Sequence, residues 1–269
     1  MSHPESPRFL KLGGMPFWGS LVVVTGGYLL FIIALLWATA SYSTPGDLFQ
    51  ALQTKEIRYS IFLSLLTCSV SALISLLIAV PIGYLLSRRN FGGKALVESI
   101  LDIPIFLPPM VIGLCLLIFF QTPAGHAIER FIPFTYTVFG VIMAQVVIAA
   151  AFAIRTMRGT FDHLSPRPEE VAMTLGCSRG GAVWRVTLPA AWKGMVAAIT
   201  VAWARSLGEF GPILVFAGAT RMKTEVLPTT VWLEMSVGNL EAAVAVSLLM
   251  VFCAIIVLVA FRMAGEREI

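Results

Sequence analysis

Long runs of apolar residues, separated by shorter polar stretches, dominate this sequence. Six of these runs reach the length of about 20 residues that a helix needs to cross a bilayer. They are Gly19–Ala40, Ser60–Leu86, Ile100–Phe120, Thr135–Ile154, Gly194–Phe216 and Asn239–Phe261. Because strands of a membrane barrel are short and alternate apolar with polar residues, the pattern predicts an all-α membrane protein with six transmembrane helices.

The first run allows two interpretations, a retained helix and a cleaved signal peptide. Ala38-Thr39-Ala40 has the small residues of a cleavage site. The apolar stretch before it is longer than the roughly 7–15 residues of a signal-peptide core. We therefore predict an uncleaved anchor helix over 19–40, preceded by a cytoplasmic segment over 1–18, with cleavage as the alternative.

The composition excludes the class of soluble proteins. Hydrophobic residues make up 58% of the 269 residues and charged residues only 13%, against about 25% in a typical soluble domain. The four cysteines are too few for a disulfide framework and are interpreted as small buried hydrophobes. The sequence contains no Gly-x-x-x-x-Gly-Lys-Ser/Thr loop for phosphate. We predict no catalytic, cofactor or metal site in this chain, and no enzyme activity of its own.

The basic residues predict the orientation of the spans. Thirteen of the nineteen Lys and Arg residues lie on the same side of the spans as the N-terminus, five lie on the other side, and Arg205 lies within a span. Because basic loops stay in the cytoplasm, both termini, including a tail over 262–269, are predicted to be cytoplasmic. The localisation predicted is the cell (inner or plasma) membrane. The net charge of +4 then reflects topology and contact with membrane lipids, not nucleic-acid binding.

The cytoplasmic stretch 155–193 is longer than the other loops and mixed in charge. Pro168 suits the start of a helix, with Glu169 and Glu170 in the first turn, and Gly176 can end that helix. A second short amphipathic piece, Gly180–Leu188, leads toward the fifth span. A short helix projecting from the membrane suits a groove on a partner protein. The alternative is a solvated connector.

The fifth run contains two ionisable residues, Arg205 and Glu209, which are four residues apart and can pair on one helix face. Ser206, Gly208 and Gly211 extend them into a polar strip. Charges inside the bilayer are costly and are by default functional. We predict that these five residues line or gate a translocation pathway; a purely structural ion pair is the alternative. Clustered prolines in the third run predict a kinked helix beside that pathway.

One motif in the cytoplasmic stretch resembles a known family. Glu170-Val171-Ala172, three residues, Gly176, nine residues and then Val186-Thr187-Leu188-Pro189 resembles the EAA loop of ABC importer permeases, with Val171 and Val186 as mild departures. The resemblance implies the type I importer permease architecture, in which this loop forms a cytoplasmic coupling helix. It also implies that a separate ATP-hydrolysing subunit docks on it. The residues then expected at the ATPase-docking surface are Glu169, Glu170, Ala172 and Gly176.

A second resemblance concerns the substrate. Arg205–Gly211 resembles the R-x-L-G-E-F-G signature of permeases for the tetrahedral oxyanions molybdate, tungstate and sulfate. Ile103–Leu114 is similar to the matching part of their third span, and Gly218–Pro228 is most similar to the molybdate/tungstate branch. The resemblance covers about 60–261, which we take as the permease domain. It implies a homodimer with a second copy of the chain, two ATPase subunits and an extracytoplasmic oxyanion-binding protein.

Three other functions stay open from the sequence. The chain could be a permease for sulfate or another anion. It could belong to a different class, an ATP-independent secondary transporter or channel that uses Arg205 and Glu209 as a charge relay. It could also be a membrane scaffold that transports nothing. Many secondary transporters are built from inverted repeats, and no convincing repeat is found here.

Overall fold

The computed structural model describes residues 14–42 and 44–266, and all regular secondary structure in these ranges is helical. The predicted cytoplasmic segment 1–18 therefore lies mostly outside the described residues, as does the end of the tail. The elements are α1 (Gly14–Tyr42), α2 (Pro45–Gln53), α3 (Lys55–Arg88), α4 (Lys94–Phe106), α5 (Pro109–Phe120), α6 (Pro123–Glu129), α7 (Val138–His163), α8 (Arg167–Thr174), α9 (Arg179–Ala182), the π-helix η1 (Val183–Thr187), α10 (Leu188–Ala190), α11 (Trp192–Leu207), the π-helix η2 (Ile213–Ala217), α12 (Leu227–Ser236) and α13 (Leu240–Glu266).

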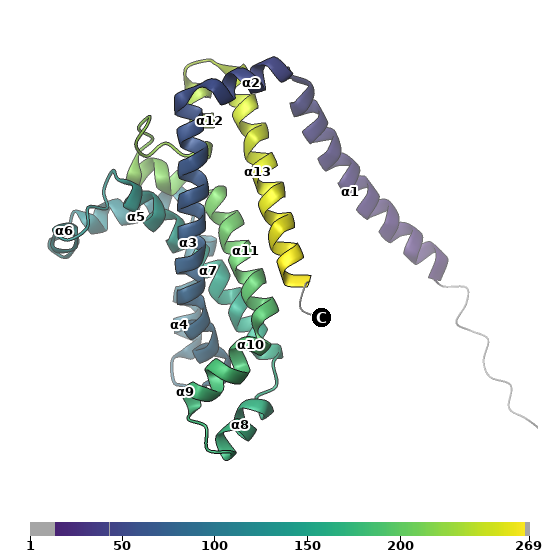
Figure 1. The fold of residues 1–269 in the computed structure, drawn as a ribbon, viewed down its shortest axis with the longest axis vertical. Helices are drawn as coiled ribbons and strands as arrows, with labels where there is room; N and C mark the ends of the chain where they lie inside the picture. Colours follow the sequence, from purple (N-terminus) through teal and green to yellow (C-terminus); the bar gives the residue numbers. More distant parts are fainter. Residues whose placement is uncertain (1–13, 43, 267–269) are drawn as a thin grey trace, which may run out of the picture.

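Apart from α1, the long helices run roughly side by side, with α2 and α12 at one end of the molecule and α8 and α9 at the other (Figure 1). We call these the α12 end and the α8 end. Within residues 14–42 and 44–266, four helices are long and apolar enough to cross a membrane: α1, α3, α7 and α13. The number reaches six if two bent pairs each count as one span, namely α4 with α5 and the segment Arg179–Ala190 with α11. We call Arg179–Ala190 the arm.

The centre of the bundle is formed by α3, α7 and α11, whose contacting faces carry small side chains. Ser71, Ala79, Ala149 and Ala198 are at most 1% exposed. Small residues at helix interfaces let backbones approach closely in a membrane, where van der Waals packing replaces the hydrophobic driving force. Gly83 is one example: a Cβ atom there would lie 2.9 Å from the backbone nitrogen of Arg158. This packing makes α3 and α7 a closely joined pair.

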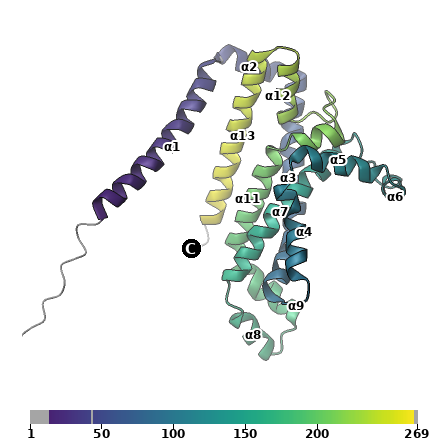
Figure 2. The same ribbon diagram turned by 180° about the vertical axis from the view of Figure 1, so that it is seen from behind.

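The third predicted span is two separate helices, α4 and α5, which meet at an angle of 111°. The interruption falls among the prolines that predicted a kink, but it is sharper than a kink and divides the span into two helices. Leu107 is extended, with ψ of 141°, and Pro108 is extended too, because a proline disfavours helical conformation in the residue before it. Pro109 then starts α5. Figure 2 shows α4 beside the bundle, where it contacts α7, and α5 pointing away from it.

The fifth predicted span is also interrupted. The helix α11 ends at Leu207, and η2 begins at Ile213. The predicted span 194–216 is therefore not one continuous helix, because Gly208, Gly211 and Pro212 fall together after Leu207 and each disfavours a helix interior. The predicted polar strip thus lies partly on α11 and partly on the break after it.

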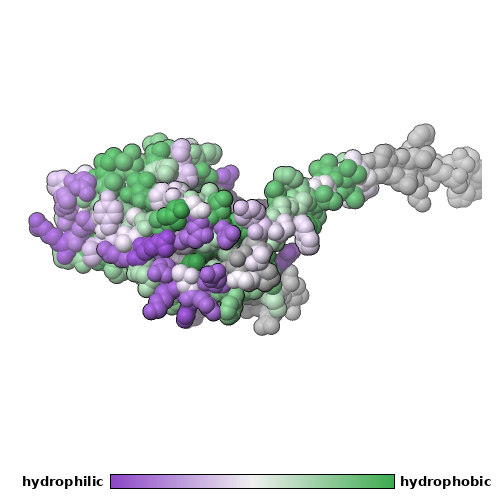
Figure 3. All heavy atoms as spheres, turned by 90° about the horizontal axis from the view of Figure 1, so that it is seen from above, coloured by the Kyte–Doolittle hydropathy of each residue, from purple (hydrophilic) through white to green (hydrophobic). Residues whose placement is uncertain are grey.

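The surface of the molecule matches a protein surrounded by lipid. The most apolar stretch of the span Phe17–Tyr42 is 0% buried, so α1 exposes apolar side chains all round. Figure 1 shows that it extends away from the bundle. Seen from the α12 end, hydrophilic side chains gather in places on the end surface, while the extended α1 is mostly hydrophobic (Figure 3). The helix predicted over 19–40 is confirmed; its retention as an anchor stays a prediction.

Candidate functional site

The short helix α8 stands at the end of the molecule, as the sequence predicts. Glu169 and Glu170 lie in its first turn, and the backbone N–H of Cys177 donates to the carbonyl of Ala172 at 3.0 Å after the last turn. Gly176 has φ of +91°, a conformation that favours glycine and reverses the chain at a helix end. The short helix and its glycine corner are therefore confirmed.

The outward face of α8 combines one charge with two apolar side chains. Glu170 and Gly176 are exposed, and Ala172 is half-buried. Val171 and Leu175 are 57% and 83% exposed, and their spacing of four residues puts them on one face of the helix. Contiguous exposed apolar side chains commonly mark an interaction surface. Leu175 was not among the predicted docking residues. The sequence could have indicated it, because an apolar pair at helical spacing in a polar loop favours an interaction surface.

Glu169 differs from the prediction of a docking residue because it is turned inward and is only 7% exposed. Its Oε1 accepts a hydrogen bond from the hydroxyl of Tyr84 on α3 at 2.5 Å, and its Oε2 accepts one from the Thr187 hydroxyl at 3.0 Å. Consecutive residues of a helix point about 100° apart. The neighbouring glutamates of α8 therefore face in different directions, Glu170 to the surface and Glu169 to the protein.

The predicted ion pair within the fifth span is present. Nη2 of Arg205 lies 2.8 Å from Oε1 of Glu209. The two partners differ in environment, since the Glu209 side chain is 2% exposed and that of Arg205 is 40% exposed. The guanidinium also stands 4.8 Å from the centre of the Phe152 ring on α7, a favourable cation–π geometry. The pair therefore bridges the point where α11 ends and holds the buried carboxylate after the break.

Gln145 on α7 secures the same region and was missed from the sequence. It is 1% exposed; its Nε2 donates to the carbonyl of Ser206 at 3.2 Å, and its Oε1 accepts from the Ser71 hydroxyl at 2.9 Å. A buried amide is stable only with such partners. Gln145 thus connects α3, α7 and the last turn of α11. The sequence feature that could have identified Gln145 is a single amide side chain within a long apolar run.

The break after α11 packs directly against the start of α5. A Cβ atom at Gly211 would lie 3.0 Å from the backbone nitrogen of Met110, and one at Gly113 would lie 2.8 Å from Cα of Pro212. The two interrupted spans therefore meet backbone to backbone. The predicted strip residues are only partly brought together: Ser206, Glu209 and Gly211 are buried, whereas Gly208 is exposed and Arg205 is half-exposed.

Substituting Gly113 tests this close contact. Gly113→Ala is expected to lower the free energy of unfolding by about 1–3 kcal/mol, because the added methyl group must displace backbone atoms of Pro212. The measurement is the thermal midpoint in detergent together with transport activity. Gly159→Ala on α7 is the matched control, since no atom lies within 4 Å of a Cβ at that position. Equal stability of the two variants would contradict the close contact.

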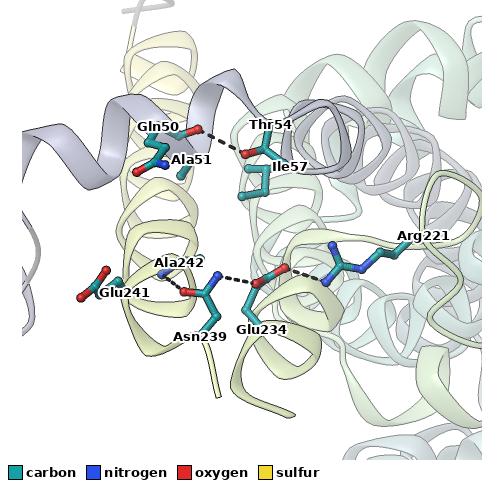
Figure 4. A pocket seen from close by; sticks show the side chains of 9 residues that line it. All are labelled: Gln50, Ala51, Thr54, Ile57, Arg221, Glu234, Asn239, Glu241 and Ala242. Atoms are coloured by element: carbon teal, nitrogen blue, oxygen red, sulfur yellow. Dashed lines mark hydrogen bonds and ion pairs between the residues drawn. The ribbon is translucent and has the colours of Figure 1, made fainter. Parts of the chain in front are cut away.

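A polar pocket lies at the α12 end, with a volume of about 350 Å³ (Figure 4). Its walls come from α2, the start of α3, Arg221 and the facing ends of α12 and α13. Oε1 of Glu234 pairs with Nη2 of Arg221 at 2.8 Å, and Oε2 accepts from Nδ2 of Asn239 at 3.0 Å. These contacts hold the segment after η2 against the start of α13. In the described part of the chain, no group of three His, Cys, Asp or Glu side chains could hold a metal ion.

Glu225, in the loop between η2 and α12, has an unusual environment. The residue is fully buried, at 0% exposure. Burial raises the pKa of its carboxyl above the ordinary value, and the positive charge of Arg221 only partly opposes this shift. The loop around it is firmly held: the hydroxyl of Tyr59 donates to the carbonyl of Lys223, and the N–H of Leu227 donates to the Ser64 hydroxyl. The α12 end is thus a folded surface.

The chain is thus a helical bundle with a short helix at one end and two interrupted spans that contact each other where they break. Residues 79–267 match the family described as "Binding-protein-dependent transport system inner membrane component". The chain belongs to this family of multi-pass inner-membrane proteins.

The names of several relatives state a substrate. The chain is 32% identical to the "Probable molybdenum ABC transporter permease protein HVO_B0370" of Haloferax volcanii, over 95% of this chain and 94% of that protein. It is 38% identical to the "Molybdate/tungstate transport system permease protein WtpB" of Pyrococcus abyssi, over 57% and 58%. It is 29% identical to the "Sulfate transport system permease protein CysT" of Escherichia coli, over 76% and 75%. All three are named as permeases.

A solved structure supports the fold. A chain of the bacterial alginate ABC transporter, crystallised with an alginate-bound periplasmic protein, superposes with a TM-score of 0.74 and 15% identity, covering 93% of this chain and 94% of that one. The predicted ABC importer permease architecture is confirmed.

Proposed function

We propose that this chain forms the translocation pathway of an ATP-driven importer for molybdate or tungstate. The observation that carries the proposal is the combination of an outward-facing α8 with two interrupted spans that meet at Gly113 and Gly211. Interrupted spans supply backbone polar groups in the middle of a membrane protein, where an anion needs transient partners. The names of the relatives and the stretch 218–228 support the choice of anion.

ATP is hydrolysed by a separate subunit that docks at α8. The exposed Val171 and Leu175 side chains provide an apolar knob, and Glu170 lies beside them to pair with a basic group of the partner. A helix that inserts an apolar face into a groove is a common mode of recognition. In this arrangement the α8 end and both termini are cytoplasmic, as the distribution of Lys and Arg favours.

A second copy of the chain completes the pathway, and a binding protein delivers the anion at the α12 end. A two-fold axis beside the meeting point of α5 and η2 brings two sets of interrupted spans together around one passage. The polar pocket at the α12 end, with its Arg221–Glu234 pair, offers a folded surface for the binding protein. The permease itself then needs only a transient path, and selectivity belongs largely to the binding protein.

Uptake by the reconstituted transporter tests this function. Proteoliposomes containing the chain with its ATPase and supplied with binding protein are expected to accumulate radiolabelled molybdate only when ATP is present. Excess tungstate is expected to block molybdate uptake. The same excess of sulfate is expected to leave most of the molybdate uptake intact. Block by sulfate would make sulfate the substrate, the second candidate that the similarity to CysT favours. Uptake without ATP or an ATPase subunit would replace the importer with a secondary transporter or channel.

A further inference from the structure

The inward-turned Glu169 occupies a junction between three parts of the molecule. The residue belongs to α8, its Oε1 is bonded to Tyr84 on α3, and its Oε2 is bonded to Thr187 at the end of η1 in the arm. Both donors are side-chain hydroxyls, and both carboxylate oxygens are used. Hydrogen bonds to an ionised acceptor are about twice as strong as neutral ones. Glu169 therefore joins α8 to the bundle and to the arm at once.

The α3 side of this junction is part of the rigid bundle. The Tyr84 ring packs edge-to-face on the Phe161 ring of α7, with centroids 5.6 Å apart. One turn further along α3, Nη2 of Arg88 donates to the carbonyl of Leu164 at 2.9 Å, which fixes the linker between α7 and α8. At Gly83, beside Tyr84, α3 packs closely on α7, since a Cβ atom there would lie 2.9 Å from the backbone nitrogen of Arg158. A force on Glu169 is therefore transmitted to the α3–α7 pair.

The arm side of the junction leads toward the interrupted fifth span. The arm meets α11 at a bend of 73°, and α11 ends at the Arg205–Glu209 pair. Between α3 and the arm lies an apolar groove of about 980 Å³, with Leu77 and Val80 on one wall and Trp184 and Leu188 on the other. At the groove, α3 and the arm are separated. The hydrogen bonds through Glu169 link them beside it.

We propose that Glu169, with Tyr84 and Thr187, forms a clamp that converts movement of α8 into movement of the arm and α11 relative to α3. The inference rests on the proposed function, since it assigns to Glu169 the transmission of a movement that an ATPase generates. The proposal gives the two neighbouring glutamates of α8 different roles. Glu170 faces the docking partner, and Glu169 is a positioning residue that makes α8 a lever instead of a loose appendage.

The test measures ATP hydrolysis and molybdate uptake in parallel with the complete transporter in proteoliposomes. Tyr84→Phe and Thr187→Val each remove one donor to Glu169 while keeping the size of the side chain. In each variant the ATPase subunit is expected to stay bound and to hydrolyse ATP, while the molybdate taken up per ATP falls about tenfold. A tenfold change corresponds to about 1.4 kcal/mol, close to the lower end of the roughly 1.5–3 kcal/mol that a hydrogen bond to a charged group contributes.

A double-mutant cycle separates the clamp from a general structural role. In a Glu169→Ala background, the added Tyr84→Phe is expected to change uptake per ATP no further, because its acceptor is already gone. If the alanine variant does not assemble, Glu169→Met takes its place, because it keeps the length of the side chain and carries no oxygen acceptor. Tyr28→Phe is the matched tyrosine control, since Tyr28 is an exposed residue of α1. Thr200→Val is the other control, since its hydroxyl bonds only within α11.

Two results overturn the clamp. One is uptake per ATP within twofold of the unmodified protein in both single variants. The other is a further loss from Tyr84→Phe in the Glu169→Ala background, which means that Tyr84 acts elsewhere. Failure of the proposed function looks different, because the unmodified protein itself then binds no ATPase or takes up molybdate without ATP. In that case the clamp falls together with the importer assignment.

Discussion

Arg205→Ala is expected to stop transport and to destabilise the protein by about 3 kcal/mol. The substitution leaves the carboxylate of Glu209, which is 2% exposed, without its partner. Removing one partner of a buried ion pair costs about 3–5 kcal/mol, and the low end applies because the Arg205 side chain is 40% exposed. The measurements are ATP-dependent molybdate uptake and the thermal midpoint of the purified complex.

The control for this variant is Arg158→Ala, which breaks ion pairs whose members are between 22% and 47% exposed. Such surface pairs contribute about 0–1 kcal/mol, so little change is expected. The double variant Arg205→Ala, Glu209→Gln removes the unpaired charge and is expected to recover assembly but not uptake. If its uptake also recovers, the pair is purely structural and the gating role is wrong.

Glu170→Lys is expected to abolish association with the ATPase subunit while the spans remain folded. The side chain is exposed beside Val171 and Leu175, so the reversed charge lies on the proposed docking surface. A lysine in the first turn costs the helix only about 0.3–1 kcal/mol, which is too little to unfold the protein. The measurement is the amount of ATPase that co-purifies with the tagged permease in mild detergent.

Glu241→Lys is the matched control, because Glu241 is also an exposed glutamate in the first turn of a helix, α13, but lies at the α12 end. It is expected to leave co-purification unchanged. Normal association of the Glu170→Lys variant would remove α8 as the docking surface. Loss of association in both variants would indicate a general effect of charge. That result would also contradict a local docking contact at Glu170.

The Arg205→Ala and Glu170→Lys variants test opposite ends of the proposed connection between the ATPase-docking surface and the translocation pathway. Alternating access needs a two-state element whose equilibrium is shifted by ligands at both ends. Docking at Glu170 supplies one ligand, and the Arg205–Glu209 pair lies where the pathway has to open. The Glu169 clamp lies between them, so the Glu170, Glu169 and Arg205 variants are expected to fail at three distinguishable steps: association, coupling and opening.

Several features of this protein followed from the sequence because they depend on local pattern. Apolar runs of about 20 residues identified the helices that became α1, α3, α7 and α13. Pro168 and Gly176 marked the start and end of α8, since proline suits a first turn and glycine suits the reversed conformation at a helix end. The spacing of Arg205 and Glu209 indicated their ion pair. Each of these predictions needs only residues that are close along the chain.

Other features were decided only by the tertiary structure, because they depend on residues far apart in the chain. Hydropathy is the same for a straight and a broken helix, so the 111° bend between α4 and α5 could not be read from it. Glu169 and Glu170 are chemically identical, and only the positions of Tyr84 and Thr187 decide which carboxylate is buried. Gln145 likewise acquired its role when α3 and α11 packed against α7. A sequence pattern specifies which residues are apolar or charged, whereas the partners of each side chain exist only once the helices have packed.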